Sequence, residues 1–553
     1  MIGALLLAMN SQDEEPLFSS LQQTLEGALV RSSNMAMQDL DGADSLLPVI
    51  FVLSNTFHLL SDDHKAELNF ALLLPALTDA AFFSPEGLEH GYWLTFIDHD
   101  VKQAGQKFSW SIRSRSAQRV QEIKSRPLVS LLGSVAKLLA YSIDHVRNSS
   151  AILRSLERLA EFAKNLAQSW RQNKLSEVDP SEERDYLDQE TLTMTLPPLL
   201  NVLRDTMFAT IIILRSIIGR VLTDPFLASN TTAPTIASHV LHILRNMYFI
   251  SHRFGQTSSS QYVFVNFTAI DILIQYPPAT ENLLQSIKPN VPNQISPHPH
   301  DRLLDLFFLN TAEHLTLTLS PSVNESLLDT TFAYIRSMGD RRLSEIYEAA
   351  HSVTLAVFAA PQTCGIAPKH IPLYIETLLA SFPSMLDARQ FRLAIRSIVR
   401  LVSPSSVISR NMPMLQAVIL DLLAQRSVAA SEALLPQDPN LPIESIQPLS
   451  EKAVLLLATI DSLPSLPLLL LEDWLPISAD LLHKISDPLQ KDICQKRFWE
   501  VISNGEMDVE RAQLCVSWWG SRGGRELIQL GELPEDDFAM SGGLGFSQQD
   551  SKL

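Results

Sequence analysis

Two short clusters in this chain combine histidine with aspartate, which are residue types that can bind metals or move protons. Asp98-His99-Asp100 places an imidazole between two carboxylates, which could hold a metal ion or orient a general base. Adjacent residues rarely point to one centre, so a surface turn is the favoured interpretation. His298-Pro299-His300-Asp301 could bind a metal as a loop, but its proline-rich surroundings favour a solvated loop.

The motifs that usually bring a cofactor or a nucleophile into a site are missing. The chain has no phosphate-binding Gly-rich loop with Lys and Ser/Thr, no Gly-x-Gly-x-x-Gly and no His-Glu-x-x-His. It also lacks a Gly-x-Ser-x-Gly elbow, and residues 520–524 are glycine-rich without matching any of these spacings. We therefore predict no catalytic, cofactor-binding or metal-ligating residue, and a chain that is not an enzyme.

Paired tryptophans stand beside two arginines near the C-terminus. Trp518 and Trp519 are followed by Arg522 and Arg525. Trp and Arg are enriched at the energetic centres of protein interfaces, so these four residues are a candidate partner interface. An equally good interpretation is that the tryptophans cap the last helix and seal the end of the fold.

The chain ends in Ser551-Lys552-Leu553, which is the peroxisomal address tripeptide. A pocket of amides and basic groups can capture the terminal carboxylate, while Ser551 permits close approach, Lys552 carries a charge and Leu553 fills an apolar hole. Residues 540–550 contain three glycines and little to bury, so we expect them to stay extended and reachable. We predict that the tripeptide is a receptor-binding targeting signal.

Composition restricts the kinds of partner. Lys and Arg number 43 against 61 Asp and Glu, which gives a net charge of −18. Without a basic surplus, neither nucleic-acid binding nor a polybasic membrane anchor is expected. Apolar runs at 45–61 and 349–368 are interrupted, so we predict buried helices and membrane association only through protein partners. The three cysteines are too few and too scattered for a disulfide framework or a zinc site.

Helical periodicity runs through nearly the whole chain. It is clearest over 151–170, where apolar residues recur at intervals of three and four and charged residues occupy the opposite face. The same pattern predicts helices at 46–60, 128–146, 199–222, 236–250, 302–315, 326–338, 344–360, 371–382 and 388–402. Strand signals are scarce, and the best strand-like run, Gln261–Phe267, could also be an extended connector.

Three breaks separate these helices. We predict an acidic linker at 171–193 and proline-rich linkers at 276–301 and 428–450. The helical regions are then 1–170, 194–275, 302–427 and 451–533, followed by a flexible tail over 534–553. Helix pairs joined by short turns, without a strict repeat period, predict an all-α fold, an irregular HEAT/armadillo-like α-solenoid of stacked helical hairpins.

Several blocks of the last third resemble the fungal peroxin-8 family. They are 455–464, 471–476, Arg497-Phe498-Trp499-Glu500-Val501, 505–508, Cys515-Val516-Ser517-Trp518-Trp519, 522–526, 540–544 and the terminal Ser-Lys-Leu, with 390–394 and 399–404 matching as well. Upstream, only the helical character is shared. The blocks have no generic chemical meaning, so the specificity of the match lies in their co-occurrence and order.

The resemblance implies a non-enzymatic component of peroxisomal matrix protein import. Members lie peripherally on the lumenal face of the peroxisomal membrane and link the receptor-docking subcomplex to the RING-finger ubiquitin-ligase subcomplex. They also engage the cycling receptor for the Ser-Lys-Leu signal and promote cargo release. We find no N-terminal nonapeptide import signal. The alternative is a helical peroxisomal matrix enzyme imported through Ser551, Lys552 and Leu553.

Overall fold

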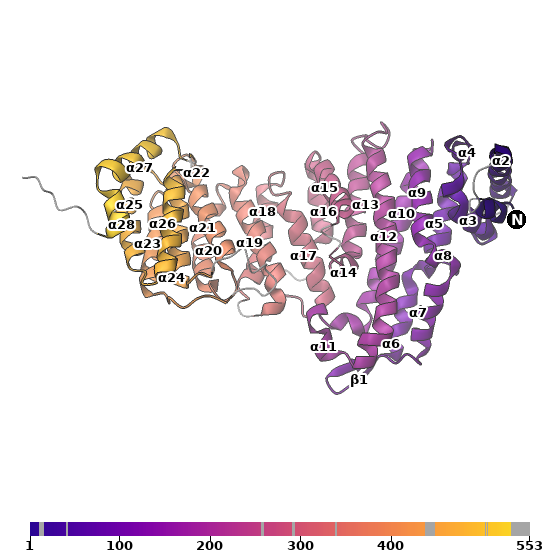
Figure 1. The fold of residues 1–553 in the computed structure, drawn as a ribbon, viewed down its shortest axis with the longest axis horizontal. Helices are drawn as coiled ribbons and strands as arrows, with labels where there is room; N and C mark the ends of the chain where they lie inside the picture. Colours follow the sequence, from indigo (N-terminus) through magenta and orange to yellow (C-terminus); the bar gives the residue numbers. More distant parts are fainter. Residues whose placement is uncertain are drawn as a thin grey trace, which may run out of the picture. The chain divides into compact units, whose positions relative to one another are not determined.

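The computed structural model describes residues 1–9, 16–39, 43–255, 259–289, 294–337, 340–436, 448–503, 505 and 507–531. The chain divides into two compact units, the first over Met1–Ala360 and the second from Pro361 onward. The described parts of both units are almost entirely helical (Figure 1), which confirms the predicted all-α class. Among the described residues, none of the helices combines the length and apolarity needed to cross a bilayer.

The first unit mixes long helices with short ones along its whole length. Its α-helices are α1 (Ile2–Met9), α2 (Pro16–Asp39), α3 (Ala43–Thr56), α4 (Asp62–Ala66), α5 (Phe70–Phe82), α6 (Thr95–Asp100), α7 (Arg115–Ser125), α8 (Pro127–Ser130), α9 (Leu132–His145), α10 (Ser149–Arg171), α11 (Glu183–Tyr186), α12 (Leu196–Val221), α13 (Thr232–Asn246), α14 (Tyr248–Ser251), α15 (Ser260–Ile274), α16 (Pro277–Ile287), α17 (Pro299–Glu313), α18 (Pro321–Ile335) and α19 (Ser344–Ala359). Short helical turns connect them: η1 (Phe57–Leu59), η2 (Glu89–Leu94), η3 (Lys174–Glu177), η4 (Pro180–Glu182), η5 (Thr191–Thr195) and η7 (Arg341–Leu343).

The long helices of this unit pack in two layers. Helices α5, α10 and α13 follow one another in one layer, and α9, α12 and α15 follow one another in the other. The layers are joined where α5 packs on α9 and α13 packs on α15. Consecutive helical pairs stacked in this way form an α-solenoid, because each pair buries its apolar faces only against its neighbours.

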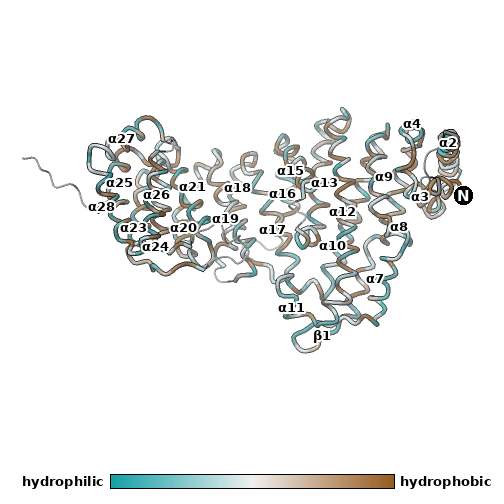
Figure 2. Tube along the Cα trace, in the orientation of Figure 1, coloured by the Kyte–Doolittle hydropathy of each residue, from teal (hydrophilic) through white to brown (hydrophobic). Residues whose placement is uncertain are grey.

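Helix α10 shows how the sequence pattern produces this packing. The Asn148 side chain accepts a hydrogen bond from the Ser150 backbone N–H and so caps the start of the helix. The stripe expected from the periodicity is buried from Ala151 through Leu159 to Trp170, on the faces that meet α5 and α13. Figure 2 shows the same alternation of hydrophobic and hydrophilic residues along the neighbouring helices. Removal of this apolar surface from water is the main stabilising contribution.

The segment 171–193, expected as an acidic linker, carries defined structure. It contains η3, η4, α11 and the start of η5. Its Leu187 forms a parallel bridge to Phe108 of a small antiparallel hairpin, β1 (Lys102–Ala104) and β2 (Lys107–Ser109). The segment 276–301 likewise contains α16 and the first residues of α17. Short helical turns can satisfy the backbone groups of polar segments without a long apolar stripe.

The strand-like run Gln261–Phe267 is helical, so its interpretation as a strand or extended connector was wrong. It lies within α15, where Tyr262 and Val265 are buried three residues apart. The apolar positions that follow in the helix pack against α12 and α13. Tertiary packing therefore overrides the β propensity of its aromatic and β-branched residues.

The second unit is built around one central helix. Its helices are η8 (Pro361–Thr363), α20 (Ala367–Ser381), α21 (Ala388–Leu401), α22 (Val407–Asn411), α23 (Leu415–Ala429), α24 (Glu451–Ser462), η9 (Leu463–Ser465), α25 (Leu468–His483), α26 (Pro488–Ser503), α27 (Val509–Ser521) and α28 (Gly524–Leu530). Helix α24 packs on α21, α23 and α26 and is buried on every side from Ala453 to Ser462. The expected linker 428–450 contains a bridge between Leu434 and Ser450, and residues 437–447 within it are not among the described residues.

Candidate functional site

The fold separates the two predicted tryptophans into a core residue and a surface residue. The Trp518 side chain is buried, and its ring lies 5.8 Å from that of Phe498 between centroids. Trp519 is half-buried and lies 5.0 Å from Trp499 of α26, which is 50% exposed. Trp518 therefore packs between α26 and α27, and Trp519 remains partly on the surface, so a partner interface at this pair stays a prediction.

Trp499, Trp519 and Val516 together form an exposed apolar group that we call the tryptophan surface. Val516 precedes Trp519 by three residues on α27, so the two share a helix face, and Val516 is 68% exposed. Sequence reasoning missed Trp499, because a single Trp in a helical pattern gives no sign of the ring that will pack beside it.

The two predicted arginines differ in their surroundings. Arg522 forms an ion pair with Glu472 of α25, so its charge is already compensated within the unit. Arg525 is exposed on α28, the helix that packs on both α25 and α27. Arg525 is thus the better placed of the two to meet a partner.

The Asp98-His99-Asp100 cluster does not form a site. The Asp98 carboxylate accepts a hydrogen bond of 3.1 Å from the backbone N–H of Lys174. The Asp100 carboxylate instead accepts one of 2.8 Å from the backbone N–H of Ser116, and hydrogen bonds from Ser116 hold the pKa of Asp100 below its usual value. The two carboxylates therefore position different segments of the chain.

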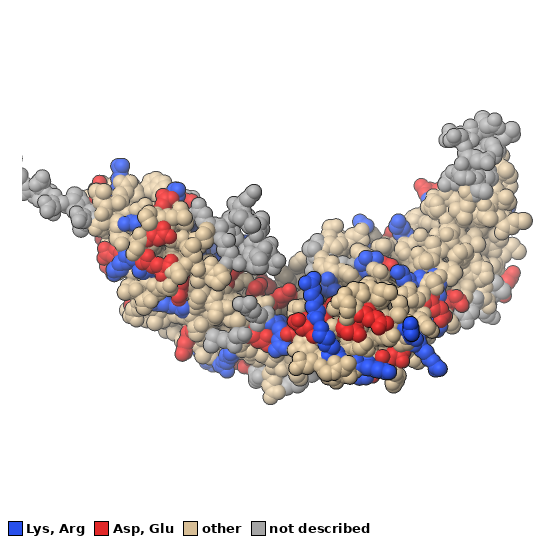
Figure 3. Space-filling view, turned by 60° about the horizontal axis from the view of Figure 1, so that its bottom comes forward, with Lys and Arg blue, Asp and Glu red and all other residues tan. Residues whose placement is uncertain are grey.

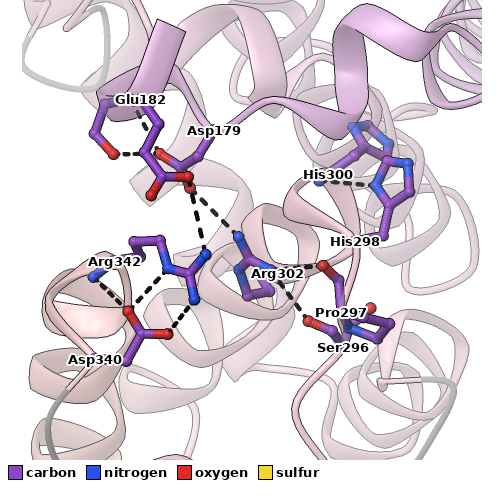
Figure 4. Close-up of polar contacts among 10 residues, drawn as sticks. Asp179, Glu182, Ser296, Pro297, His298, His300, Arg302, Asp340 and Arg342 are labelled. Atoms are coloured by element: carbon purple, nitrogen blue, oxygen red, sulfur yellow. Dashed lines mark hydrogen bonds and ion pairs between the residues drawn. The ribbon is translucent and has the colours of Figure 1, made fainter. Parts of the chain in front are cut away.

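The His298-Pro299-His300-Asp301 cluster begins helix α17 and is drawn in part in Figure 4. The Nδ1 atom of His298 accepts a hydrogen bond of 3.1 Å from the backbone N–H of His300, which caps the helix. His300 itself is buried, and burial lowers its pKa to about 4. Asp301 receives two hydrogen bonds of 2.8 Å from Arg171. In the part of the chain that the structure describes, no group of three or more His, Cys, Asp or Glu side chains could hold a metal ion.

A polar network beside this helix start ties three segments together (Figure 4). Arg302 donates a hydrogen bond of 2.8 Å to the carbonyl of Pro297 and lies 3.5 Å from a carboxylate oxygen of Asp179. Arg342 pairs with Asp340 at 2.8 Å and approaches Glu182 at 3.9 Å. Segment 171–193 is thereby attached to α17 and to the residues around η7, which is a structural function.

The targeting tripeptide Ser551-Lys552-Leu553 and the rest of the expected tail 534–553 lie outside the described residues. The structure therefore adds nothing to the prediction that these residues bind a receptor, and that prediction stands on the sequence alone.

Comparison with known families gives four matches in chain order. The Peroxin 8 protein-like N-terminal domain matches residues 1–65, and the PEX8 helical domain matches 113–257. The PEX8 central TPR-like domain matches 280–359, and the PEX8 C-terminal domain matches 367–526. The chain belongs to the fungal peroxin-8 family. The tryptophan surface lies inside the match to the C-terminal domain, as do Arg522 and Arg525.

Curated relatives carry names from the same field. The peroxin-8 chain is 28% identical over 434 residues to "Peroxisomal membrane protein PEX17" of Yarrowia lipolytica, an alignment that covers 72% of this chain and 61% of that protein. It is 24% identical over 441 residues to "Peroxisomal biogenesis factor 8" of Komagataella phaffii, covering 68% of this chain and 61% of the relative. The chain thus spans about 61% of the length of these relatives.

Membership of a peroxin family supports a role in peroxisome biogenesis and a peroxisomal location. One of these relatives is named for peroxisome biogenesis and the other for the peroxisomal membrane. Among solved structures, a mutant of Kap121p is similar at 13% identity and a TM-score of 0.30, covering 96% of this chain and 63% of that one. Importin beta is similar at 12% identity and a TM-score of 0.25, covering 95% of this chain and 69% of that one.

Proposed function

We propose that this peroxin-8 chain is a non-enzymatic scaffold of peroxisomal matrix protein import. On the lumenal face of the peroxisomal membrane it links the docking subcomplex to the RING ubiquitin-ligase subcomplex. It also engages the cycling receptor for the Ser-Lys-Leu signal and promotes release of the receptor's cargo. The observation that carries the proposal is the run of four peroxin-8 domain matches between residues 1 and 526, on a chain that ends in Ser551-Lys552-Leu553.

The architecture suits a protein that holds several partners at once. Stacked helical pairs expose a long surface, because each pair is covered only by its neighbours. Each of the two units is compact and has its own buried residues, so each can present a binding surface of its own.

The tryptophan surface is the partner interface that we propose on the second unit. Trp499 and Trp519 are large rings that leave apolar area in water, and Val516 extends that area along α27. Trp and Arg are enriched at binding hot spots, in which a few side chains carry most of the affinity, and an exposed apolar patch marks such a surface. Arg525 then contributes at the rim, whereas Arg522 is held by Glu472.

The terminal tripeptide supports a second contact, with the receptor's own signal pocket. A tail that ends in Ser551-Lys552-Leu553 competes with cargo tails that end in the same residues, and such competition releases cargo. A labelled cargo peptide bound to the receptor tests this step. The full chain should displace the peptide, and the chain truncated after Asp550 should not. Failure of the full chain to displace the peptide at saturating concentration would contradict the competition.

The first experiment is to image an unrelated fluorescent reporter that carries Ser-Lys-Leu in cells that lack this protein. We expect the reporter to remain in the cytosol while peroxisomal membranes persist. Normal import of the reporter would overturn the scaffold function. A second round re-introduces the chain with Trp499→Ala and Trp519→Ala, which should restore import poorly. The matched control is Leu469→Ala, which truncates an apolar residue of the same unit that is more exposed, at 81%, and lies outside the tryptophan surface; it should restore import fully.

A further inference from the structure

One segment of the first unit is basic, although the chain as a whole has a negative net charge. Residues 102–126 contain seven Lys or Arg and a single acidic residue, in a chain whose net charge is −18. The segment covers the β1–β2 hairpin and helix α7, which lie at the lower edge of the first unit in Figure 1. The expectation that no polybasic membrane contact exists relied on the total charge, which cannot detect a local surplus.

The β1–β2 hairpin is exposed along most of its length. Residues 102–107 are all exposed, and a side chain built at Gly105 would meet nothing within 4 Å. The strand register pairs Lys102 with Ser109 and Ala104 with Lys107. Because alternate residues of a strand share a face, this register places Lys102 and Lys107 on the same face of the hairpin.

Three further cations surround the hairpin. Arg113 and Arg115 are exposed at the start of α7, and Arg184 is exposed on α11. The Lys107 ammonium lies 3.3 Å from the backbone carbonyl of Arg184, which brings α11 against the hairpin. We call Lys102, Lys107, Arg113, Arg115 and Arg184 the basic tip. Figure 3 shows Lys and Arg side chains extending from the surface of this unit, with Asp and Glu side chains between them.

Most carboxylates near the basic tip are engaged by the fold. Asp100 accepts a hydrogen bond from Ser116 N–H, Asp188 from Thr191 N–H and Glu190 from Ile112 N–H, each at 2.8 Å. These acids hold the backbone of the segment in place. Lys102, Arg113, Arg115 and Arg184 are exposed, and Lys107 donates to the backbone carbonyl of Arg184. Asp185 is exposed beside Arg184 and offsets part of the positive charge.

Exposed apolar side chains accompany these cations. Phe96 of α6 is 58% exposed, and Ile112 and Tyr186 are exposed in the segments that meet the hairpin. This combination suits the interfacial layer of a bilayer. Basic side chains bind the charged headgroups there, and aromatic and aliphatic side chains lie at the level of the headgroups.

We propose that the basic tip binds the surface of a membrane that contains anionic phospholipids. A projecting hairpin with long, separate side chains fits a flat and fluid layer of headgroups, whereas an ordered acidic peptide needs a groove or a sheet edge with side-chain pockets. Two cavities of the first unit lie elsewhere, one beside Tyr248 and one beside His242. This contact adds direct lipid binding to association through protein partners, and it does not depend on the scaffold function.

Co-sedimentation of the full-length chain with vesicles tests the proposal. Binding should be weak with phosphatidylcholine alone and strong when part of it is replaced by phosphatidylserine or phosphatidylinositol. Binding should also fall as salt is raised, because mobile ions screen the attraction. Each basic residue near an anionic surface changes the partition coefficient by about five-fold. Joint replacement of Lys102, Lys107, Arg113 and Arg115 by Gln should therefore lower binding by at least about ten-fold, since not all four touch lipid at once.

The matched control removes the same number of charges from elsewhere on the first unit. Lys137, Arg147, Arg154 and Lys164 are exposed, and their joint replacement by Gln should leave vesicle binding unchanged. Equal thermal melting of both variants shows that each remains folded. Equal binding to neutral and anionic vesicles, or equal loss in both variants, would overturn the proposal. A soluble poly-glutamate peptide that binds the basic tip, with no binding to any vesicle, would assign the surface to an acidic protein partner and would equally refute membrane contact.

Discussion

Asp461 of the central helix α24 is the charged residue on which the second unit should depend most. Its carboxylate is 6% exposed and accepts hydrogen bonds of 2.8 Å from Arg392 Nε on α21 and 2.7 Å from Arg497 Nε on α26. A second nitrogen of Arg392 lies 2.7 Å from the same carboxylate. Three helices therefore meet at one buried anion. Replacement of Asp461 by Ala leaves the positive charges of Arg392 and Arg497 without the carboxylate that both of them bind.

The size of the effect follows from how far the arginines can reach water. Removal of one partner of a fully buried ion pair costs about 3–5 kcal/mol, because the remaining charge stays desolvated. The side chains of Arg392 and Arg497 are 25% and 26% exposed, so water recovers part of their solvation. We therefore expect Asp461→Ala to lower the free energy of unfolding of the second unit by about 2–4 kcal/mol. This corresponds to a fall in the urea midpoint of about 1–2 M.

Urea unfolding followed by hydrogen exchange and mass spectrometry separates the two units. Peptides from α21, α24 and α26 should lose protection at lower urea in the variant, while peptides from α10 should not change. The surface pair Asp492–Lys496 gives a control, because its side chains are 51% and 72% exposed. Asp492→Ala should cost less than about 0.5 kcal/mol.

A compensated variant tests whether charge is the cause. Joint replacement of Arg392 and Arg497 by Met and of Asp461 by Leu removes all three charges and keeps apolar volume, so stability should return close to that of the original chain. If the triple variant is as unstable as Asp461→Ala, or if Asp461→Ala costs no more than Asp492→Ala, then the account of the buried anion is wrong.

Three further outcomes are expected. Burial lowers the pKa of both His300 and His351 to about 4, below the unfolded value of about 6.5, so the first unit should lose stability as pH falls from about 6.5 towards 4. Burial raises the pKa of Asp305 to about 6, so this carboxyl opposes the trend, but it contributes one proton where the two histidines contribute two. The variant His300→Asn should therefore flatten a plot of Tm against pH. Burial raises the pKa of the Cys494 thiol to about 12 and that of Cys515 to about 11, so a thiol reagent should modify the native chain at Cys364 first, and faster labelling of Cys494 would contradict this. A Cβ at Gly524 would lie 2.6 Å from the Trp518 ring, so Gly524→Ala should destabilise the second unit by about 1–3 kcal/mol, and an unchanged urea midpoint would contradict the close packing.

The helical architecture could be predicted because its signal is local. The expected helices at 388–402 and 344–360 are α21 (Ala388–Leu401) and α19 (Ser344–Ala359), and the Asp387–Gln390 capping box begins α21 as the residue types suggest. The run Gln261–Phe267 was wrongly predicted to be a strand or an extended connector. Its side chains suit strands, but they also fit a helix in which neighbouring helices bury every third or fourth residue. The β1–β2 hairpin was missed because its polar strands have no apolar alternation to reveal them.

The surfaces were harder to predict than the elements. Trp518 and Trp519 are adjacent in sequence, yet the helix turns one into the core and leaves the other beside Trp499. Sequence spacing gives the face of a helix but not the depth at which a neighbouring helix covers it. The basic tip was missed for a different reason, since a count over the whole chain averages seven cations of one segment against acids that lie elsewhere.

The two proposed surfaces lie on separate units, which makes their functions separable by mutation. The tryptophan surface is built from α26 and α27, and the basic tip from the β1–β2 hairpin, α7 and α11, each on its own core. Substitutions at exposed side chains change stability little and do not cross from one core to the other. A variant with an altered basic tip should therefore lose vesicle binding while it still binds the partner of the tryptophan surface, and the reverse should hold for Trp499→Ala with Trp519→Ala. Joint loss of both activities in either variant would mean that the two units do not act independently, and that membrane contact and partner binding are one event.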